Sequence, residues 1–383
     1  MTGPLEGVRV VEVGQALAGP LAGAILADMG AEVVKVEKPD GGDDACGWGP
    51  PWGPSLGGGG GDTSLYFHGQ NRNKLGVTLD LKSAGDVEAL HGLCETADIL
   101  IQNLRPGVVE ELGFGPDAML ERHPRLIYCS IWAFGFEGPM RLAPGFDPLL
   151  QAYGGMMSLT GRPEDPPTFC GASINDKATG MFCVIGALAA LRQRDRTGRG
   201  CLVDTSLFET AVHWVEGPLN AYLVDGRVPK RHGTGGAVIV PYQVFETADR
   251  PLCLAAGNDR LWARCAAVLG HPEWGTEARF ATGPQRVRNK GELIPLIQAI
   301  MKERTRAHWL DALAVAGVPS GPVNDIGELA ATEQLAAVGI LQDLPEGGPR
   351  VVGLPISFDR QRPLSARRAP RLGEHNGPVL GRP

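Results

Sequence analysis

The sequence predicts an α/β protein with one large open parallel sheet and a smaller α+β domain. Two β-branched runs, Val8–Gly14 and Ala31–Glu37, flank an apolar segment, Pro20–Gly30. Proline in the first turn and glycine just past the end are typical of a helix. The three segments therefore form a βαβ unit, which indicates an open Rossmann-like domain.

The same alternation continues down the chain. Further strands are expected at Ala97–Asn103, Arg125–Trp132 and Cys201–Leu207. Further helices are expected at Ser83–Thr96, Pro116–Pro124, Ala178–Arg194 and Phe208–Leu223. Strands that alternate with helices of this length predict a sheet covered by helices. Residues 1–205 are assigned to this large domain.

A change in composition marks the second domain. Residues 206–227 read as a linking helix and loop, and the loop Asp225–Gly236 is rich in glycine and charge. Beyond it, Pro241–Gly257 predicts a β-hairpin, and helical segments follow as far as Val315. We assign residues 228–326 to the smaller domain.

Composition excludes several classes of function. The chain has 383 residues, enough for two cores, and a net charge of −7, which leaves no basic footprint for nucleic acid. No run of 18 apolar residues and no signal-peptide pattern is found, so no membrane span is expected. The eight cysteines and eight histidines are scattered, which argues against a metal site. Free thiols indicate a reducing, cytoplasmic location.

One aspartate stands out in the Gly/Pro-rich stretch Pro144–Gly180. This stretch delivers Asp176 to the start of the long apolar helix predicted from Ala178. The carboxylate could be a helix N-cap, which satisfies free backbone N–H groups. It could also be a nucleophile that the positive end of the helix keeps ionised. The residues alone leave both readings open.

Nine segments in a fixed order carry a resemblance that covers nearly the whole chain. They are Leu5–Pro39, Asn71–Lys82, Asn103–Phe114, Gly145–Gly155, Thr160–Pro163, Asp176–Gly180, Arg196–Leu207, Gly317–Asp325 and Ala369–Asn376. In these segments the chain resembles the family III CoA-transferases, the group that includes formyl-CoA transferase and the carnitine-related CoA-transferases.

The resemblance implies a reaction and a set of residues for it. Asp176 would attack the thioester of an acyl-CoA, which is a substrate, and no permanent cofactor or metal is implied. The implied CoA contacts are Leu17, Ala18, Lys38, Leu79, Lys82, Asn103, Leu104 and Arg105. The implied acyl pocket contains Phe146, Asp147, Tyr153, Gly235 and Gly236. The family also implies that residues 327–383 return to the large domain and that two copies form an interlocked homodimer.

The chain departs from the family at three positions. Leu17 replaces a glutamine of formyl-CoA transferase, which argues against oxalate or formate as the acyl group. Glu111 replaces an arginine near CoA, so one phosphate contact is either missing or supplied elsewhere, with Arg105 and Arg141 as the candidates. The run Gly57–Gly61 does not match the family's active-site glycine loop, is expected to be a surface loop, and leaves Gly233–Gly236 as the candidate.

Two alternatives remain. The α-methylacyl-CoA racemases share this fold, but their proton-transferring histidine falls at Phe146, which cannot move a proton. A CoA-binding protein without activity is the other alternative, and the retained Asp176 argues against it.

Overall fold

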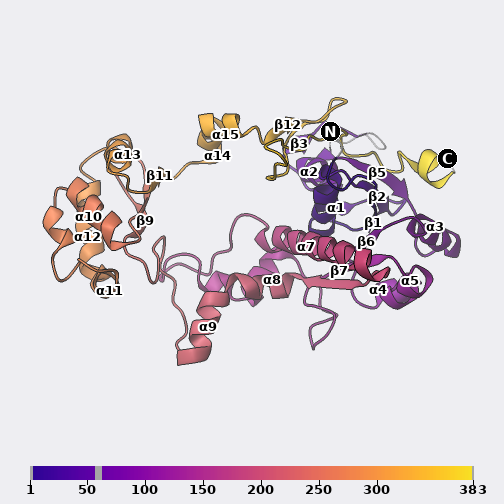
Figure 1. Cartoon of the computed structure of the whole chain (residues 1–383), viewed down its shortest axis with the longest axis horizontal. Helices are drawn as coiled ribbons and strands as arrows, with labels where there is room; N and C mark the ends of the chain where they lie inside the picture. Colours follow the sequence, from indigo (N-terminus) through magenta and orange to yellow (C-terminus); the bar gives the residue numbers. More distant parts are fainter. Residues whose placement is uncertain (1–2, 57–62, 382–383) are drawn as a thin grey trace. The chain divides into compact units, whose positions relative to one another are not determined.

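The computed structural model describes residues 3–56 and 63–381, so the predicted surface loop Gly57–Gly61 lies outside the described residues. The chain divides into two compact units, each with its own core (Figure 1). The large unit comprises Met1–Met156, Phe169–Val224 and Gln334–Pro383, and the small unit comprises Met157–Thr168 and Asp225–Glu333.

A six-stranded parallel sheet forms the centre of the large unit, which confirms the predicted α/β class. Its strands, in spatial order, are β5 (Lys74–Thr78), β2 (Glu32–Glu37), β1 (Arg9–Val13), β6 (Ile99–Gln102), β7 (Ile127–Trp132) and β8 (Leu202–Ser206). The order of the strands reverses between β1 and β6. In open α/β sheets, ligands bind at the carboxyl ends of the strands at such a switch point.

Helices cover both faces of the sheet, because successive strand residues point to opposite faces and are apolar on each of them. Val10 and Val33 pack with α1 (Ala18–Asp28) and α7 (Ile174–Thr197) on one face. Val11 and Val34 pack with α3 (Ala84–Cys94) and α5 (Pro116–Arg122) on the other. Near-continuous apolar strands of this kind are typical of parallel sheets buried on both faces.

Helix α7 is long and apolar enough to cross a bilayer by length and composition. The search for a run of 18 apolar residues did not predict this feature. It packs along α1 and against β7 and β8, and 44% of its most apolar window is buried inside the protein (Figure 1). It ends at Gly198, whose φ of 73° closes the helix in the left-handed conformation that glycine adopts without strain. Core packing therefore accounts for part of the apolar sequence of α7.

The C-terminal segment pairs with the edge strand β5. The N–H of Gly76 donates to Nδ1 of His375 (3.1 Å), and the N–H of Thr78 donates to Oδ1 of Asn376 (2.9 Å). These contacts satisfy donors that an open sheet edge would leave unpaired.

Two sequence predictions in the large unit differ from the structure. The single helix expected at Phe208–Leu223 is two helices, α8 (Leu207–Trp214) and α9 (Glu216–Asp225), separated at Val215. The long helix begins at Ile174, so Asp176 lies in its first turn and not before it.

The remaining elements outside the core of the small unit are short. They are η1 (Asp44–Gly47), β3 (Trp52–Gly53), β4 (Thr63–Ser64), α2 (Leu65–Asn71), α4 (Val108–Glu111), α6 (Asp147–Tyr153), η2 (Met156–Ser158), α15 (Glu333–Val338), β12 (Leu341–Asp343), β13 (Arg350–Val352) and η4 (Asn376–Leu380).

The small unit is an antiparallel sheet covered by helices. Its strands are β9 (Tyr242–Phe245), β10 (Leu252–Ala255) and β11 (Ser320–Pro322), of which the first two form the predicted hairpin. Its helices are α10 (Asp259–Val268), η3 (Pro272–Gly275), α11 (Gly283–Arg288), α12 (Lys290–Met301), α13 (Arg306–Val315) and α14 (Ile326–Ala330). Trp262 and Phe280 are fully buried at its core.

Candidate active site

The turn that follows β1 is fixed at the switch point of the sheet. The N–H of Gln15 donates to Oδ1 of Asn103 (2.9 Å), and Nδ2 of Asn103 donates to the carbonyl of Gln15 (2.8 Å). The next residue, Ala16, has a positive φ of 65°, and its N–H donates to Oδ1 of Asp43 (3.0 Å). Asn103, a predicted CoA contact, therefore also joins the ends of β1 and β6.

A buried cluster of charged side chains stabilises this turn through hydrogen bonds to its backbone. The ammonium of Lys35 lies 3.0 Å from Oδ2 of Asp43, 2.9 Å from the carbonyl of Gly14 and 3.3 Å from Oε1 of Glu12. Burial alone would lower the pKa of Lys35, but the charges of Glu12 and Asp43 outweigh it and raise that pKa above its usual range. Removing one member would leave a buried charge unpaired, which is strongly destabilising.

A pocket of about 390 Å³ lies beside this turn, and we call it the Lys38 pocket. Its lining includes four of the predicted CoA contacts, Lys38, Leu79, Lys82 and Leu104. Nζ of Lys38 lies 2.8 Å from Oδ1 of Asp44 in an exposed ion pair. Glu111 lines the same pocket, so the chain places a negative charge where the resemblance implied a positive one. Lys38 and Lys82 are the cations of this lining that can meet a phosphate.

A second pocket of about 460 Å³, the Asp176 pocket, holds the candidate nucleophile. Gln15 and Leu104 line both pockets, so the two are adjacent. The predicted contacts that line it are Leu17, Ala18, Asn103, Leu104, Arg105 and Phe146. The arrangement can hold an extended ligand, with phosphates near Lys38 and a reacting carbonyl near Asp176.

Asp176 is not the N-cap of its helix. Oδ2 of Asp147 accepts hydrogen bonds from the N–H groups of Asn175 (2.7 Å) and Asp176 (3.1 Å). The donors that were expected to keep Asp176 ionised are therefore already engaged. Burial, reinforced by the charge of Asp147, raises the pKa of Asp176 to about 7. The start of α7 therefore does not hold the pKa of Asp176 at its ordinary value in this structure.

The predicted acyl-pocket residues are spread over several places. Phe146 is 65% exposed and lines the Asp176 pocket, whereas Asp147 is buried and bonds to the backbone of α7. Tyr153 packs against Phe134, with ring centroids 5.2 Å apart, and lies outside the described lining of the pocket.

Gly235 and Gly236 belong to the small unit, in the turn before β9. There the N–H of Gly236 donates to the carbonyl of Tyr242 (2.9 Å). Their place in the acyl pocket stays a prediction.

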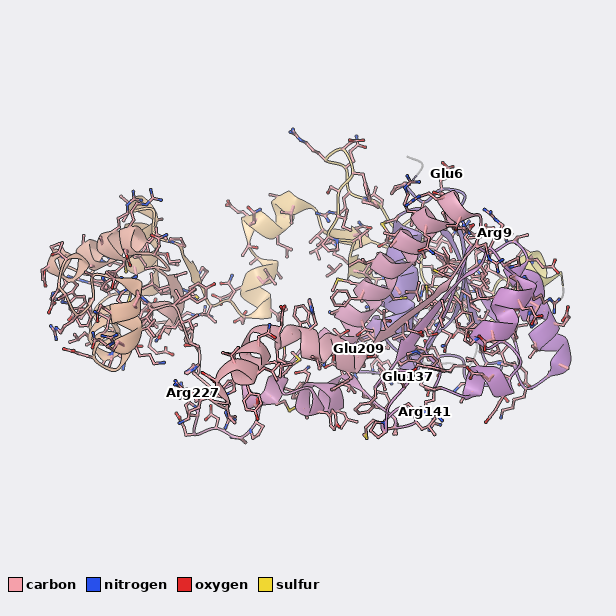
Figure 2. All side chains as sticks on the ribbon, turned by 60° about the horizontal axis from the view of Figure 1, so that its bottom comes forward. Glu6, Arg9, Glu137, Arg141, Glu209 and Arg227 are labelled. Carbon is pink, nitrogen blue, oxygen red and sulfur yellow. The ribbon has the colours of Figure 1, made fainter. Side chains whose placement is uncertain are left out.

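The lining of the Asp176 pocket contains further residues beyond the predicted contacts, among them Asp44, Trp48 and Arg141. Arg141, which sequence reasoning considered only as a substitute phosphate contact, lies with Glu137 on the loop after β7 (Figure 2). The signal that the sequence offered for Trp48 is its own aromatic side chain within the segment Asp43–Pro51.

The model of CoA-transferase family III matches residues 5–376. The chain belongs to this family. It is 36% identical over 374 residues to acetyl-CoA:oxalate CoA-transferase of Acetobacter aceti, which covers 97% of this chain and 94% of that one. It is 38% identical over 381 residues to succinate–glutarate CoA-transferase of Agrobacterium fabrum, covering 98% and 95%.

A solved structure agrees with this family III assignment. A CAIB/BAIF family protein from Brucella suis superposes with a TM-score of 0.86 at 35% identity, covering 100% of this chain and 99% of that one. The protein is therefore a family III CoA-transferase by sequence and by fold.

Proposed function

We propose that the protein moves CoA from an acyl-CoA to a carboxylic acid through covalent intermediates on Asp176. The observation that carries the proposal is the position of Asp176 in a pocket adjacent to the pocket that Lys38 and Lys82 line. A carboxylate nucleophile divides one difficult acyl transfer into easier steps.

The steps follow from the chemistry of a thioester. An oxygen of Asp176 attacks the thioester carbonyl, the C–S bond breaks, and a mixed anhydride and the CoA thiolate are formed. The thiolate attacks the aspartyl carbonyl, which releases the first acid and leaves CoA on Asp176 as a thioester. The acceptor carboxylate attacks the carbonyl of this thioester, the C–S bond breaks, and a second anhydride and the CoA thiolate are formed. The thiolate then attacks the acceptor's carbonyl, which releases the new acyl-CoA and regenerates Asp176.

We propose a short dicarboxylic acid as the acceptor. The relatives at 33–38% identity include proteins named for glutarate, mesaconate and oxalate. Arg105 and Arg141 line the Asp176 pocket and can pair with a second carboxylate. Buried Leu17 and exposed Phe146 make the same pocket partly apolar, which favours an acid longer than oxalate.

A panel of acyl-CoA donors and acids tests this proposal. We expect exchange with succinyl-CoA and glutarate to exceed exchange with oxalate or formate, followed by mass spectrometry of the CoA esters. Exchange confined to monocarboxylic acids would contradict the dicarboxylate assignment. Absence of exchange with every pair would contradict the proposed function.

The pH dependence of the reaction follows from the raised pKa of Asp176. The nucleophile must be ionised, and its pKa of about 7 means that protonation removes it below neutrality. We expect kcat/KM to fall as the pH drops through about 7, because this parameter reports the free enzyme. A limb of kcat/KM near pH 4 would show that Asp176 is not the titrating group.

Lys38 should contribute to CoA affinity and not to turnover. The variant Lys38→Ala removes an exposed positive charge. An exposed ion pair with a phosphate contributes about 1 kcal/mol to binding, so the Kd for acyl-CoA should rise severalfold. The value of kcat should barely change, because phosphates bind equally in the ground and transition states. Comparison with dephospho-CoA esters shows which phosphate is contacted. If the wild type and Lys38→Ala bind CoA esters with equal affinity, and dephospho-CoA esters likewise, Lys38 is a solvated charge.

Phe146 provides the test against a racemase. It lies in the Asp176 pocket where proton transfer would need an acid or base. We therefore expect no exchange of the α-proton of 2-methylacyl-CoA esters in deuterated water, measured by mass spectrometry. Rapid incorporation of deuterium at the α-carbon would instead favour the racemase alternative.

We also propose that two copies associate, as the family resemblance implies. Light scattering across a range of protein concentrations should give the mass of a dimer.

A further inference from the structure

Asp147 and Gln151 form a buried clamp around the segment that carries the nucleophile. Both residues belong to α6 and lie one turn apart, and both are almost fully buried, at 3% and 1% exposure. Nε2 of Gln151 donates to Oδ1 of Asp147 (2.5 Å). Residues spaced by four positions face each other on a helix, so this bond holds the carboxylate in one orientation.

The clamp contacts both the loop that precedes α7 and the first turn of α7. Oε1 of Gln151 accepts from the N–H of Cys170 (2.8 Å), and its Nε2 lies 3.4 Å from the carbonyls of Cys170 and Ala172. Oδ2 of Asp147 accepts the two N–H groups at the start of α7. The loop that approaches the helix and the first turn of the helix are therefore both fixed to α6.

The clamp does not contact the CoA pockets. Asp147 and Gln151 lie outside the described linings of the Lys38 and Asp176 pockets, whereas Asp176 lines the second of them. The hydrogen bonds of Asp147 to the N–H groups of Asn175 and Asp176 connect it to the segment that carries the nucleophile.

We propose that Asp147, held by Gln151, is a positioning residue that orients the first turn of α7 and thereby directs Asp176 toward the acyl-CoA. The inference rests on the proposed function. Small misplacements of a reacting group cost large factors in rate, so a buried clamp of this kind has a direct effect on catalysis.

Asp147 also acts on Asp176 through its charge. The other charged groups around Asp176 are Asp44, Arg105 and Arg141 in the pocket lining and the exposed neighbour Lys177. Helix α8, which packs on α7, carries Glu209 and His213 (Figure 2 labels Glu209). Among these groups it is Asp147 whose charge, after burial, raises the pKa of Asp176.

Three variants separate positioning from a general loss of structure. Asp147→Asn removes the charge and keeps the shape. Gln151→Met removes the hydrogen bonds of the clamp and keeps the charge of Asp147. Asp98→Asn is the matched control, because Asp98 bonds to Arg194 in the last turn of α7, 2.8 Å away, at the end of the helix opposite to the nucleophile.

We expect kcat to fall about tenfold or more in Asp147→Asn and Gln151→Met with KM for acyl-CoA unchanged. Removal of a negative charge favours the ionised form of Asp176, so the acidic limb of kcat/KM should move about one unit to lower pH in Asp147→Asn only. Asp98→Asn should keep the wild-type kcat and limb. A limb and kcat in Asp147→Asn that match the control would overturn the inference.

A measurement independent of activity distinguishes failure of the clamp from failure of the proposed function. Asp176→Asn, introduced alone, should stabilise the protein at pH 8, because it removes a partly buried charge. In the Asp147→Asn background this gain should shrink, since the repulsive partner is gone. An equal gain in both backgrounds, measured by denaturant unfolding, would show that Asp147 does not act on Asp176. A wild-type protein without CoA exchange would contradict only the proposed function.

Discussion

Asp176→Ala is expected to abolish CoA exchange while the protein remains folded. The side chain lines the pocket that we assign to the thioester, and the capping of α7 comes from Asp147 and not from Asp176. Loss of a covalent nucleophile should reduce the exchange rate by roughly 10³-fold or more. Initial rates of acyl-CoA formation, followed by mass spectrometry, provide the measurement.

The control for this variant is Lys177→Ala. Lys177 is the exposed neighbour of Asp176 in the same turn of α7 and belongs to neither described pocket lining. It should retain wild-type exchange, so a loss in both variants would point to damage of the helix. Substantial exchange by Asp176→Ala would remove Asp176 from the mechanism.

Asp176→Asn is expected to stabilise the protein at pH 8. Burial raises the pKa of Asp176 from 3.8 to about 7, so the folded state favours the protonated acid, which an amide imitates. The stability contributed by Asp176 is fully present below about pH 4 and is lost as the pH rises through about 7. The variant should therefore gain roughly 1–3 kcal/mol in free energy of unfolding at pH 8.

Denaturant unfolding at several pH values checks this expectation. The difference between variant and wild type should be small near pH 4, grow toward pH 7, and stay constant above it. A variant that is less stable than the wild type at pH 8 would show that the carboxylate is stabilised in the fold. A gain in stability together with a loss of exchange is typical of a strained functional group.

The sheet could be predicted where local sequence and tertiary structure agree. The runs that became β1, β2, β6, β7 and β8 are apolar and β-branched, and their ends were placed within about two residues. Strand β5 was not predicted because its five residues include Lys74 and Gly76, which are weak strand formers. Its place at the sheet edge is stabilised by residues of the C-terminal segment, His375 and Asn376, which no local pattern can reveal.

The site shows the same division. Local sequence and the family resemblance together singled out Asp176 and Lys38, which the structure places in adjacent pockets. The capping of α7 could not be predicted, because Asp147 lies 29 positions before Asp176 and reaches it only through the packing of α6 against α7. The raised pKa of Asp176 follows first from burial and then from the charge of Asp147, which the same packing brings close.

The covalent route through Asp176 can be tested most directly with an acceptor acid labelled with oxygen-18 in its carboxylate. In the proposed steps the acceptor oxygen joins Asp176 to the acyl group, and the final attack of the thiolate on the acyl carbonyl leaves that oxygen on the aspartate. After a single turnover, the peptide containing Asp176 should carry one label, and further turnover should deliver label to the released donor acid. CoA exchange at the normal rate with no label in any peptide would contradict the proposed mechanism.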